Sequence, residues 1–283
     1  MSGWRRDVTE WLQIQFPIRW ETIESSLNEP VPNHLKKWWW CIGGIPAYLF
    51  VVLLVTGIAL TFYYVPDPDR AYDSVSRITH EVPYGWYVRG LHKWSATFMI
   101  ISVVLHVLRV FFTTSYRRPR ELTWITGAFL LFITLGFAFT GYSLVYEQLS
   151  YWGITVAANM TAVVPLVGPM MADFMRGGET LGEDTLTRFF VFHIGVMPCL
   201  LSAFLILHIV QIRLPGVTEL HFEDEKPGAS QPFRFFPDHA LTALISGVAL
   251  MILLSALPVI FPAALPAKAD TLVTSPHRMP AWQ

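Results

Sequence analysis

Residues 88–109, VRGLHKWSATFMIISVVLHVLR, decide the fold of this chain because they are apolar enough to cross a membrane yet carry His92 and His106. A second apolar stretch carries His193 and His208. At about 100° and 1.5 Å per residue, steps of 14 and 15 residues keep each pair near one helix face. Ionisable residues inside a span indicate function, and imidazole is a common iron ligand. We therefore expect two helices that clamp two stacked hemes, rather than four unrelated packing histidines.

The composition indicates a membrane protein. Of 283 residues, 53% are hydrophobic and 14% charged, and the mean hydropathy is +0.43. The net charge of -1 gives no indication of a nucleic-acid partner. We expect an all-α membrane protein, a transmembrane four-helix heme-binding bundle plus a fifth span. Stretches long enough to cross about 30 Å of hydrocarbon lie at 40–64, 90–112, 123–143, 190–212 and 240–261.

The distribution of basic residues predicts the orientation in the membrane. Twelve Lys and Arg lie on the side of the N-terminus and seven on the opposite side, so we expect a cytoplasmic N-terminus. We expect the chain to lie in a bacterial plasma membrane or an equivalent energy-transducing membrane. Residues 4–27 place apolar and charged residues at helical spacing, which predicts an interfacial helix or, alternatively, the face of a soluble domain.

The chain is expected to have three parts. These are an N-terminal amphipathic arm (1–37), the four-helix domain (38–216) and a linker with the fifth span (217–283). The connection at 144–189 alternates apolar runs with Pro and Gly, which predicts short helices on the outer surface.

Two arginines flank the histidines of the first stretch. Arg89 stands three residues before His92, and Arg109 stands three residues after His106. Each guanidinium therefore shares a helix face with an imidazole. A heme propionate in a low-dielectric site needs such a cation. The alternative is two arginines that snorkel at helix ends.

Four glycines form a second pattern with the same spacing. Gly43 and Gly57, and then Gly127 and Gly141, are each separated by 14 residues. Glycine costs up to about 1 kcal/mol in a helix. Matched pairs therefore predict that something bulky, such as a porphyrin edge, passes close to the backbone at two heights. Small-residue helix packing is the alternative.

Several strings together resemble the cytochrome b/b6 family, the diheme subunit of b6f/bc-type quinol oxidoreductases. They are CIGGI at Cys41, TGIALTFYY at Thr56, VRGLHKWSA at Val88, LHVLRV at Leu105, RRPRELTWITG at Arg117, TGYSL at Thr140 and TLTRFF at Thr185. Residues 232–282 resemble the start of the companion subunit IV.

The resemblance implies roles for particular residues. His92 and His193 would ligate the heme b nearer the outer side, and His106 and His208 the heme b nearer the cytoplasm. Cys41 matches a cysteine that attaches a further heme, a heme c, through one thioether. A buried, inert cysteine is the alternative on physical grounds.

The chain departs from the family at the outer quinol site. The family's Pro-Glu-Trp-Tyr motif is replaced by Pro280, Ala281, Trp282 and Gln283, without a carboxylate. We expect that Glu147 or a residue of another subunit takes the quinol proton, or else that quinol oxidation at this site is impaired. A solvated loop acid is the alternative for Glu147.

On the cytoplasmic side, Arg213 and Asp238 match family residues beside the quinone-reducing site. An arginine keeps a neighbouring carboxylate ionised, so the pair could relay protons to a reduced quinone. A structural salt bridge is equally compatible with the sequence.

The expected function is electron transfer between quinol and quinone sites through two b hemes, coupled to proton translocation. The resemblance implies that the chain acts only in an assembled, homodimeric complex. Its partners would be a Rieske iron–sulfur protein, a c-type cytochrome and a subunit with the remaining spans. Two alternatives stay open: a diheme anchor that passes electrons between quinone and a dehydrogenase, and a non-redox bundle whose histidines carry protons.

Overall fold

The structure is a computed structural model that describes residues 30–32, 35, 42–178, 181–213 and 233–270. It divides into two compact units, and the larger one comprises residues 42–216 and 249–283. The smaller one comprises residues 1–41 and 217–248. Three features of the sequence analysis lie outside the described residues: the expected interfacial helix at 4–27, Cys41, and Pro280 to Gln283.

Among the residues that the structure describes, five helical stretches are long and apolar enough to cross a membrane, which confirms the fold class. Three are single helices: α3 (Gly44–Thr61), α5 (Gly85–Phe112) and α6 (Glu121–Ser143). The fourth joins α9 (Glu183–Val191), η3 (Phe192–Val196) and α10 (Met197–Arg213), and the fifth joins η4 (Phe235–His239) and α11 (Ala240–Ile260). Large apolar side chains remain exposed along these helices, among them Val55, Phe132 and Ile252. Such a surface is suited to lipid rather than water.

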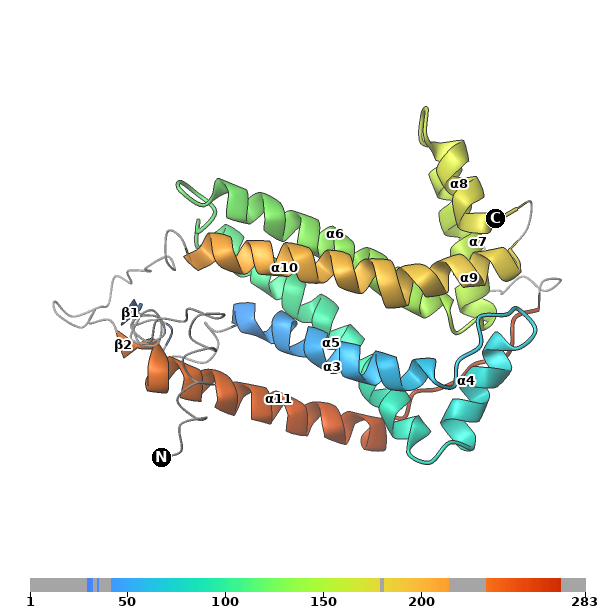
Figure 1. Cartoon of the computed structure of the whole chain (residues 1–283), viewed down its shortest axis with the longest axis horizontal. Helices are drawn as coiled ribbons and strands as arrows, with labels where there is room; N and C mark the ends of the chain where they lie inside the picture. The colour runs from blue at the N-terminus through green and yellow to red at the C-terminus, as the bar shows by residue number, and fades with distance from the viewer. Residues whose placement is uncertain (1–29, 33–34, 36–41, 179–180, 214–232, 271–283) are drawn as a thin grey trace, which may run out of the picture. The chain divides into compact units, whose positions relative to one another are not determined.

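The four-helix bundle of the larger unit is built from two packed pairs. α3 lies along α5, and α6 lies along α10 (Figure 1). Between the pairs lies an apolar core that includes Leu49, Phe50, Met99 and Leu201. Leu254, from the half of α11 that belongs to this unit, is also fully buried in the core.

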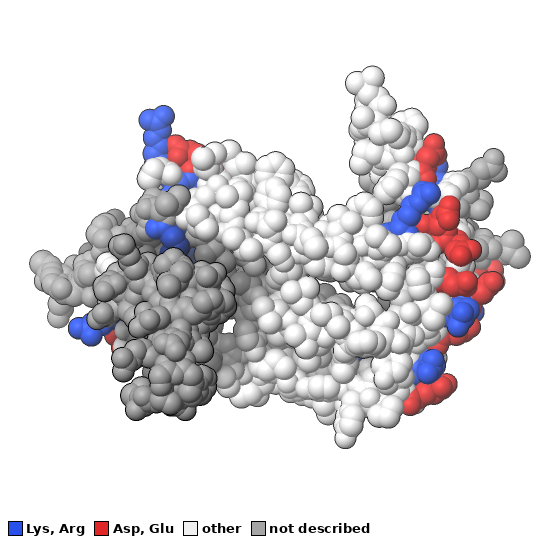
Figure 2. Space-filling view, viewed as in Figure 1, with Lys and Arg blue, Asp and Glu red and all other residues white. Residues whose placement is uncertain are grey.

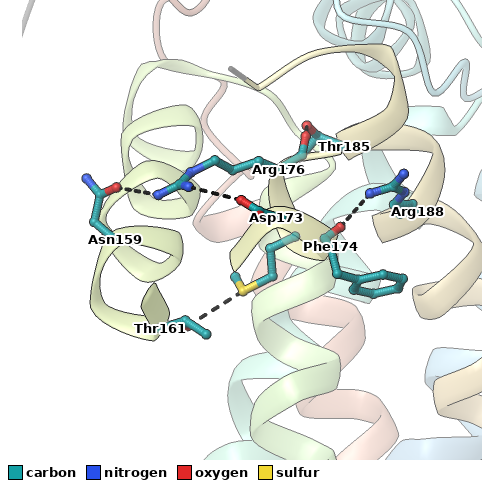
Figure 3. Close-up of polar contacts among 8 residues, drawn as sticks. Asn159, Thr161, Asp173, Phe174, Arg176, Thr185 and Arg188 are labelled. Atoms are coloured by element: carbon teal, nitrogen blue, oxygen red, sulfur yellow. Dashed lines mark hydrogen bonds and ion pairs between the residues drawn. The ribbon is translucent and has the colours of Figure 1, made fainter. Parts of the chain in front are cut away.

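Short helices occupy the connection at 144–189, as predicted. α7 (Gln148–Ala162) and α8 (Gly168–Arg176) precede α9. Arg176 ties them together, because it donates to Asn159 Oδ1 at 2.7 Å and lies 3.8 Å from Asp173 Oδ1 (Figure 3). Thr185 of α9 donates to the Arg176 carbonyl, and Arg188 donates to the Phe174 carbonyl at 2.8 Å. Polar contacts therefore link the three helices to one another.

The segment after α11 is fastened to α5 and to α4 (Ala71–His80). Trp94 Nε1 donates to the Phe261 carbonyl at 3.0 Å, and Tyr72 donates to the Pro266 carbonyl at 2.7 Å. Lys268 pairs with Asp73 at 3.0 Å. Charged side chains of this region gather at one end of the bundle, while the helix surface that Figure 2 shows beside it is uncharged.

The smaller unit contains a two-stranded antiparallel sheet. β1 (Pro30–Val31) pairs with β2 (Phe233–Arg234), with Val31 opposite Phe233. Val31, Leu35 and Phe233 form a small apolar cluster with Phe235.

Candidate functional site

The four histidines form two facing pairs across the bundle. His92 of α5 faces His193 of η3, with ring centroids 6.3 Å apart and ring planes at 71°. His106 of α5 faces His208 of α10, at 6.5 Å and 85°. Two nitrogen–metal bonds of about 2 Å each, plus two ring half-widths, account for about 6 Å. Each pair is therefore spaced to hold one metal ion between its imidazoles.

A wide helical turn aligns the second helix with the first. The π-turn η3 contains His193, and the N–H of Met197 donates to the Phe192 carbonyl. Such a turn takes up one extra residue. The 15-residue step from His193 to His208 therefore matches the 14-residue step from His92 to His106. The difference of one residue was the only sequence signal for the π-turn.

Three of the four histidines contact a threonine through Nδ1, which the sequence analysis missed. The contacts are Thr56 with His92 at 2.8 Å, Thr126 with His208 at 3.1 Å, and Thr140 with His193 at 3.2 Å. The available signal was that each of these threonines immediately precedes one of the spaced glycines.

These contacts determine which imidazole nitrogen can bind a metal. Thr56 donates its hydroxyl hydrogen to the Val52 carbonyl at 2.7 Å, so its oxygen accepts a hydrogen from His92 Nδ1. A histidine that is protonated on Nδ1 has its lone pair on Nε2. Partners of this kind orient metal-binding imidazoles and raise their basicity. Thr126 donates to Gln211 Oε1 of α10 at 2.7 Å, and Thr140 donates to the Phe137 carbonyl of its own helix at 2.9 Å. Their oxygens therefore accept from Nδ1 in the same way.

Each spaced glycine lies against a different histidine. A Cβ at Gly57 or Gly127 would lie 3.3 Å from Cε1 of His92 or His208, and a Cβ at Gly43 would lie 3.0 Å from Cε1 of His106. A Cβ at Gly141 would overlap the ring of His193. An imidazole is thus the neighbour that the structure places against each spaced glycine, and the approach of a porphyrin edge stays a prediction.

Two imidazoles alone do not complete a metal site. Within the part of the chain that the structure describes, no group of three or more His, Cys, Asp or Glu could hold an ion. Each pair would supply two nitrogen ligands, and the other ligands would come from a bound group such as the four nitrogens of a heme. The facing rings, fixed Nδ1 atoms and glycine cradle therefore fit heme.

The flanking arginines differ in their surroundings. Arg89 donates to the carbonyls of Ala263 at 2.8 Å and Ala264 at 3.0 Å, and to Thr79 Oγ1 at 3.2 Å. A guanidinium has five N–H donors, so Arg89 keeps donors for a propionate while it also anchors the segment after α11. Arg109 is half-buried one turn beyond His106.

Glu147 is a buried acid that begins α7, so it is not a solvated loop residue. Its side chain is 4% exposed and accepts from the Leu149 N–H at 3.1 Å and from the Tyr142 hydroxyl at 3.1 Å. Burial, and then the nearby Tyr151, raise the pKa of the neighbouring Tyr146 to about 12, so that phenol stays protonated. Tyr146 is therefore not the proton acceptor of this region.

The predicted pair on the cytoplasmic side is not brought together within one unit. Arg213 ends α10 of the larger unit, and Asp238 lies in η4 of the smaller unit. Their pairing stays a prediction, as does heme attachment at Cys41, which lies outside the described residues.

These features define a class of protein: a transmembrane helix bundle with two stacked bis-histidine sites. The family model for cytochrome b/b6/petB matches residues 26–216. Cytochrome b6 of Prochlorococcus marinus (strain NATL1A) is 41% identical over 211 residues, which are 75% of this chain and 96% of the relative. Cytochrome b6 of Heliomicrobium gestii is 41% identical over 210 residues, 74% of this chain and 99% of the relative.

A solved structure agrees with these matches. A chain of a hyperthermophilic respiratory Complex III superposes with a TM-score of 0.80 at 25% identity, covering 96% of this chain and 73% of that chain. The chain described here belongs to the cytochrome b/b6 family. It is an integral membrane protein for electron transfer in a cytochrome b-containing quinol oxidoreductase, and the family implies b hemes.

Proposed function

We propose that the chain carries electrons across the membrane between two b hemes. His92 and His193 would hold one heme, and His106 and His208 the other. The observation that carries the proposal is the pair of ring separations, 6.3 and 6.5 Å, each of which would accommodate one metal ion between two imidazoles. When bound, the heme supplies one-electron redox chemistry at its iron.

The packing between the two sites supports electron rather than proton transfer. Leu49, Met99 and Leu201 belong to the apolar core. Leu49 lies between the two spaced glycines of α3, Met99 lies between the two histidines of α5, and Leu201 lies between His193 and His208. These side chains exchange no protons, so a proton relay would depend on the few buried hydroxyls at such positions, those of Ser95, Ser102 and Thr134. This argues against the alternative of a bundle whose histidines carry protons.

Quinol oxidation is proposed at the end of the bundle near Glu147. Glu147 follows Gly141 closely in the chain, and Gly141 lies against His193. The carboxylate would take a quinol proton while the Tyr142 hydroxyl holds its Oε1 at 3.1 Å. Quinone reduction is proposed at the opposite, cytoplasmic end, with Arg213, Asp238 and a heme c at Cys41.

The proposed partners are a Rieske iron–sulfur protein, a c-type cytochrome and a subunit with further spans, in a homodimeric complex that translocates protons. Likeness to a chain of a respiratory Complex III supports this assembly over a diheme anchor. Mild-detergent purification of the full chain from its native membranes tests the choice. We expect two dithionite-reducible b hemes and a co-purifying Rieske protein. A co-purifying dehydrogenase without a Rieske protein would instead support the anchor.

Covalent heme at Cys41 has its own test. A thioether survives denaturation and acid–acetone extraction, whereas axial coordination does not. We expect heme staining of the denatured wild-type chain and its loss in Cys41→Ser, with both b hemes retained. Absence of staining on the wild-type chain would assign Cys41 to packing.

A further inference from the structure

His106 differs from the other three histidines in what meets its Nδ1. Among the described residues, His106 Nδ1 is buried without a hydrogen-bond partner. Each of the other rings faces a glycine that is preceded by threonine, whereas Gly43 is preceded by Ile42. The position that supplies a hydroxyl at three sites therefore supplies a hydrocarbon side chain at the fourth.

His106 differs from the other three histidines in the chemistry of the side chain at this position, and not in how its ring lies against the glycine. Gly43 has helical dihedral angles (φ −66°, ψ −24°) where it caps α3, and Ile42 lies in the 3₁₀ turn directly before α3, 14 residues before Thr56. The ring of His106 also lies against its glycine as the others do, with Cε1 3.0 Å and Nδ1 3.3 Å from a Cβ built on Gly43. A hydroxyl at position 42 would therefore be placed as the Thr56 hydroxyl is.

The absence of a hydrogen-bond partner at Nδ1 changes the redox potential of the metal that the ring binds. A hydrogen bond from Nδ1–H raises the basicity of the imidazole, and a more basic ligand favours the oxidised, more positively charged iron. We infer that Ile42 is a positioning residue that raises the midpoint potential of the His106–His208 site by withholding a hydrogen bond from His106. This inference rests on the proposed function.

The test compares two substitutions of equal shape. Ile42→Thr supplies a hydroxyl, and Ile42→Val supplies a methyl group in its place. The assembled complex is titrated potentiometrically while the α-bands of both b hemes and the EPR signals of their ferric forms are recorded. Relative to Ile42→Val, we expect Ile42→Thr to lower the midpoint potential of one heme by about 59 mV. For a one-electron couple, this shift corresponds to a change of about tenfold in the equilibrium constant for reduction. The other heme is expected to stay unchanged.

Two further substitutions test the effect of the hydrogen bond at other positions, by removing a hydroxyl instead of adding one. Thr126→Val removes the partner of His208 and should raise the potential of the same heme. Thr56→Val removes the partner of His92 and should raise the potential of the other heme. Thr126→Val decides the matter if Ile42→Thr fails to assemble.

Equal potentials in Ile42→Thr and Ile42→Val, or no change in Thr126→Val, with both hemes bound, would overturn the inference. A wild-type complex without two b hemes would overturn the proposed function instead.

Discussion

At the scale of single residues, two glycines of α6 allow a matched comparison. Both lie in the same helix, but only one of them lies against a histidine. Gly127 lies against His208, and a Cβ there would be 3.3 Å from the ring. Gly136 has nothing within 4 Å of the corresponding point. The two positions share a helix, so that backbone effects of an added methyl group are matched.

Gly127→Ala should therefore displace the imidazole of His208 and reduce heme binding at that site about tenfold or more. Gly136→Ala should leave both hemes in place, because its methyl group meets open space. The measurement is heme b per chain by pyridine hemochrome. Equal heme content in the two variants would contradict the assigned role of Gly127.

Sequence spacing was sufficient to select the four histidines and the four glycines, and the structure brings each glycine to its own histidine. It could not assign the Nδ1 partners, because these depend on how α3 and α6 are rotated toward α5 and α10. Thr56, Thr126 and Thr140 were visible only as a repeated Thr-Gly pair. The roles of Arg213 and Asp238 stay predictions, because the two residues belong to different units.

At the scale of elements, all five spans were predictable because length and hydropathy alone identify a membrane helix. Short α4 was not predicted, since ten polar-rich residues give no membrane signal. The π-turn η3 was also missed, because one extra residue leaves the hydropathy of the span unchanged. Its effect is nevertheless decisive, since it sets the register between His193 and His208.

A deletion in this turn should be tolerated. Removal of Gly195 converts the π-turn into an α-turn and leaves a 14-residue step between His193 and His208, equal to the step in α5. Deletion of the exposed Ile101 in α5 should instead rotate His106 by about 100° away from His208. We expect two b hemes without Gly195 and one without Ile101, measured in reduced-minus-oxidised spectra. Loss of a heme on deletion of Gly195 would contradict the proposed role of η3.

At the scale of the whole molecule, the larger unit places a candidate proton acceptor at one end of a bundle that carries two redox sites. Glu147 is buried there and bonded to Tyr142. An amide at this position keeps the oxygen that accepts from Leu149 N–H, so α7 remains capped. It cannot take a proton.

Glu147→Gln in the assembled complex should therefore slow quinol oxidation by about 10²-fold, the lower range for general-base catalysis, with unchanged heme content. Asp173→Asn is the matched control, because Asp173 is an exposed acid of the neighbouring helix α8. The steady-state rate of quinol-dependent cytochrome c reduction is the readout. Unchanged turnover in Glu147→Gln would show that the proton leaves by another route.

The central claim is that each facing histidine pair holds its own b heme. The most direct measurement is the pyridine hemochrome ratio of heme b to chain in the wild type and in His106→Ala, purified from the same membranes. We predict two hemes in the wild type and one in His106→Ala, with the remaining heme held by His92 and His193. Two intact b hemes in His106→Ala, or fewer than two in the wild type, would contradict the account.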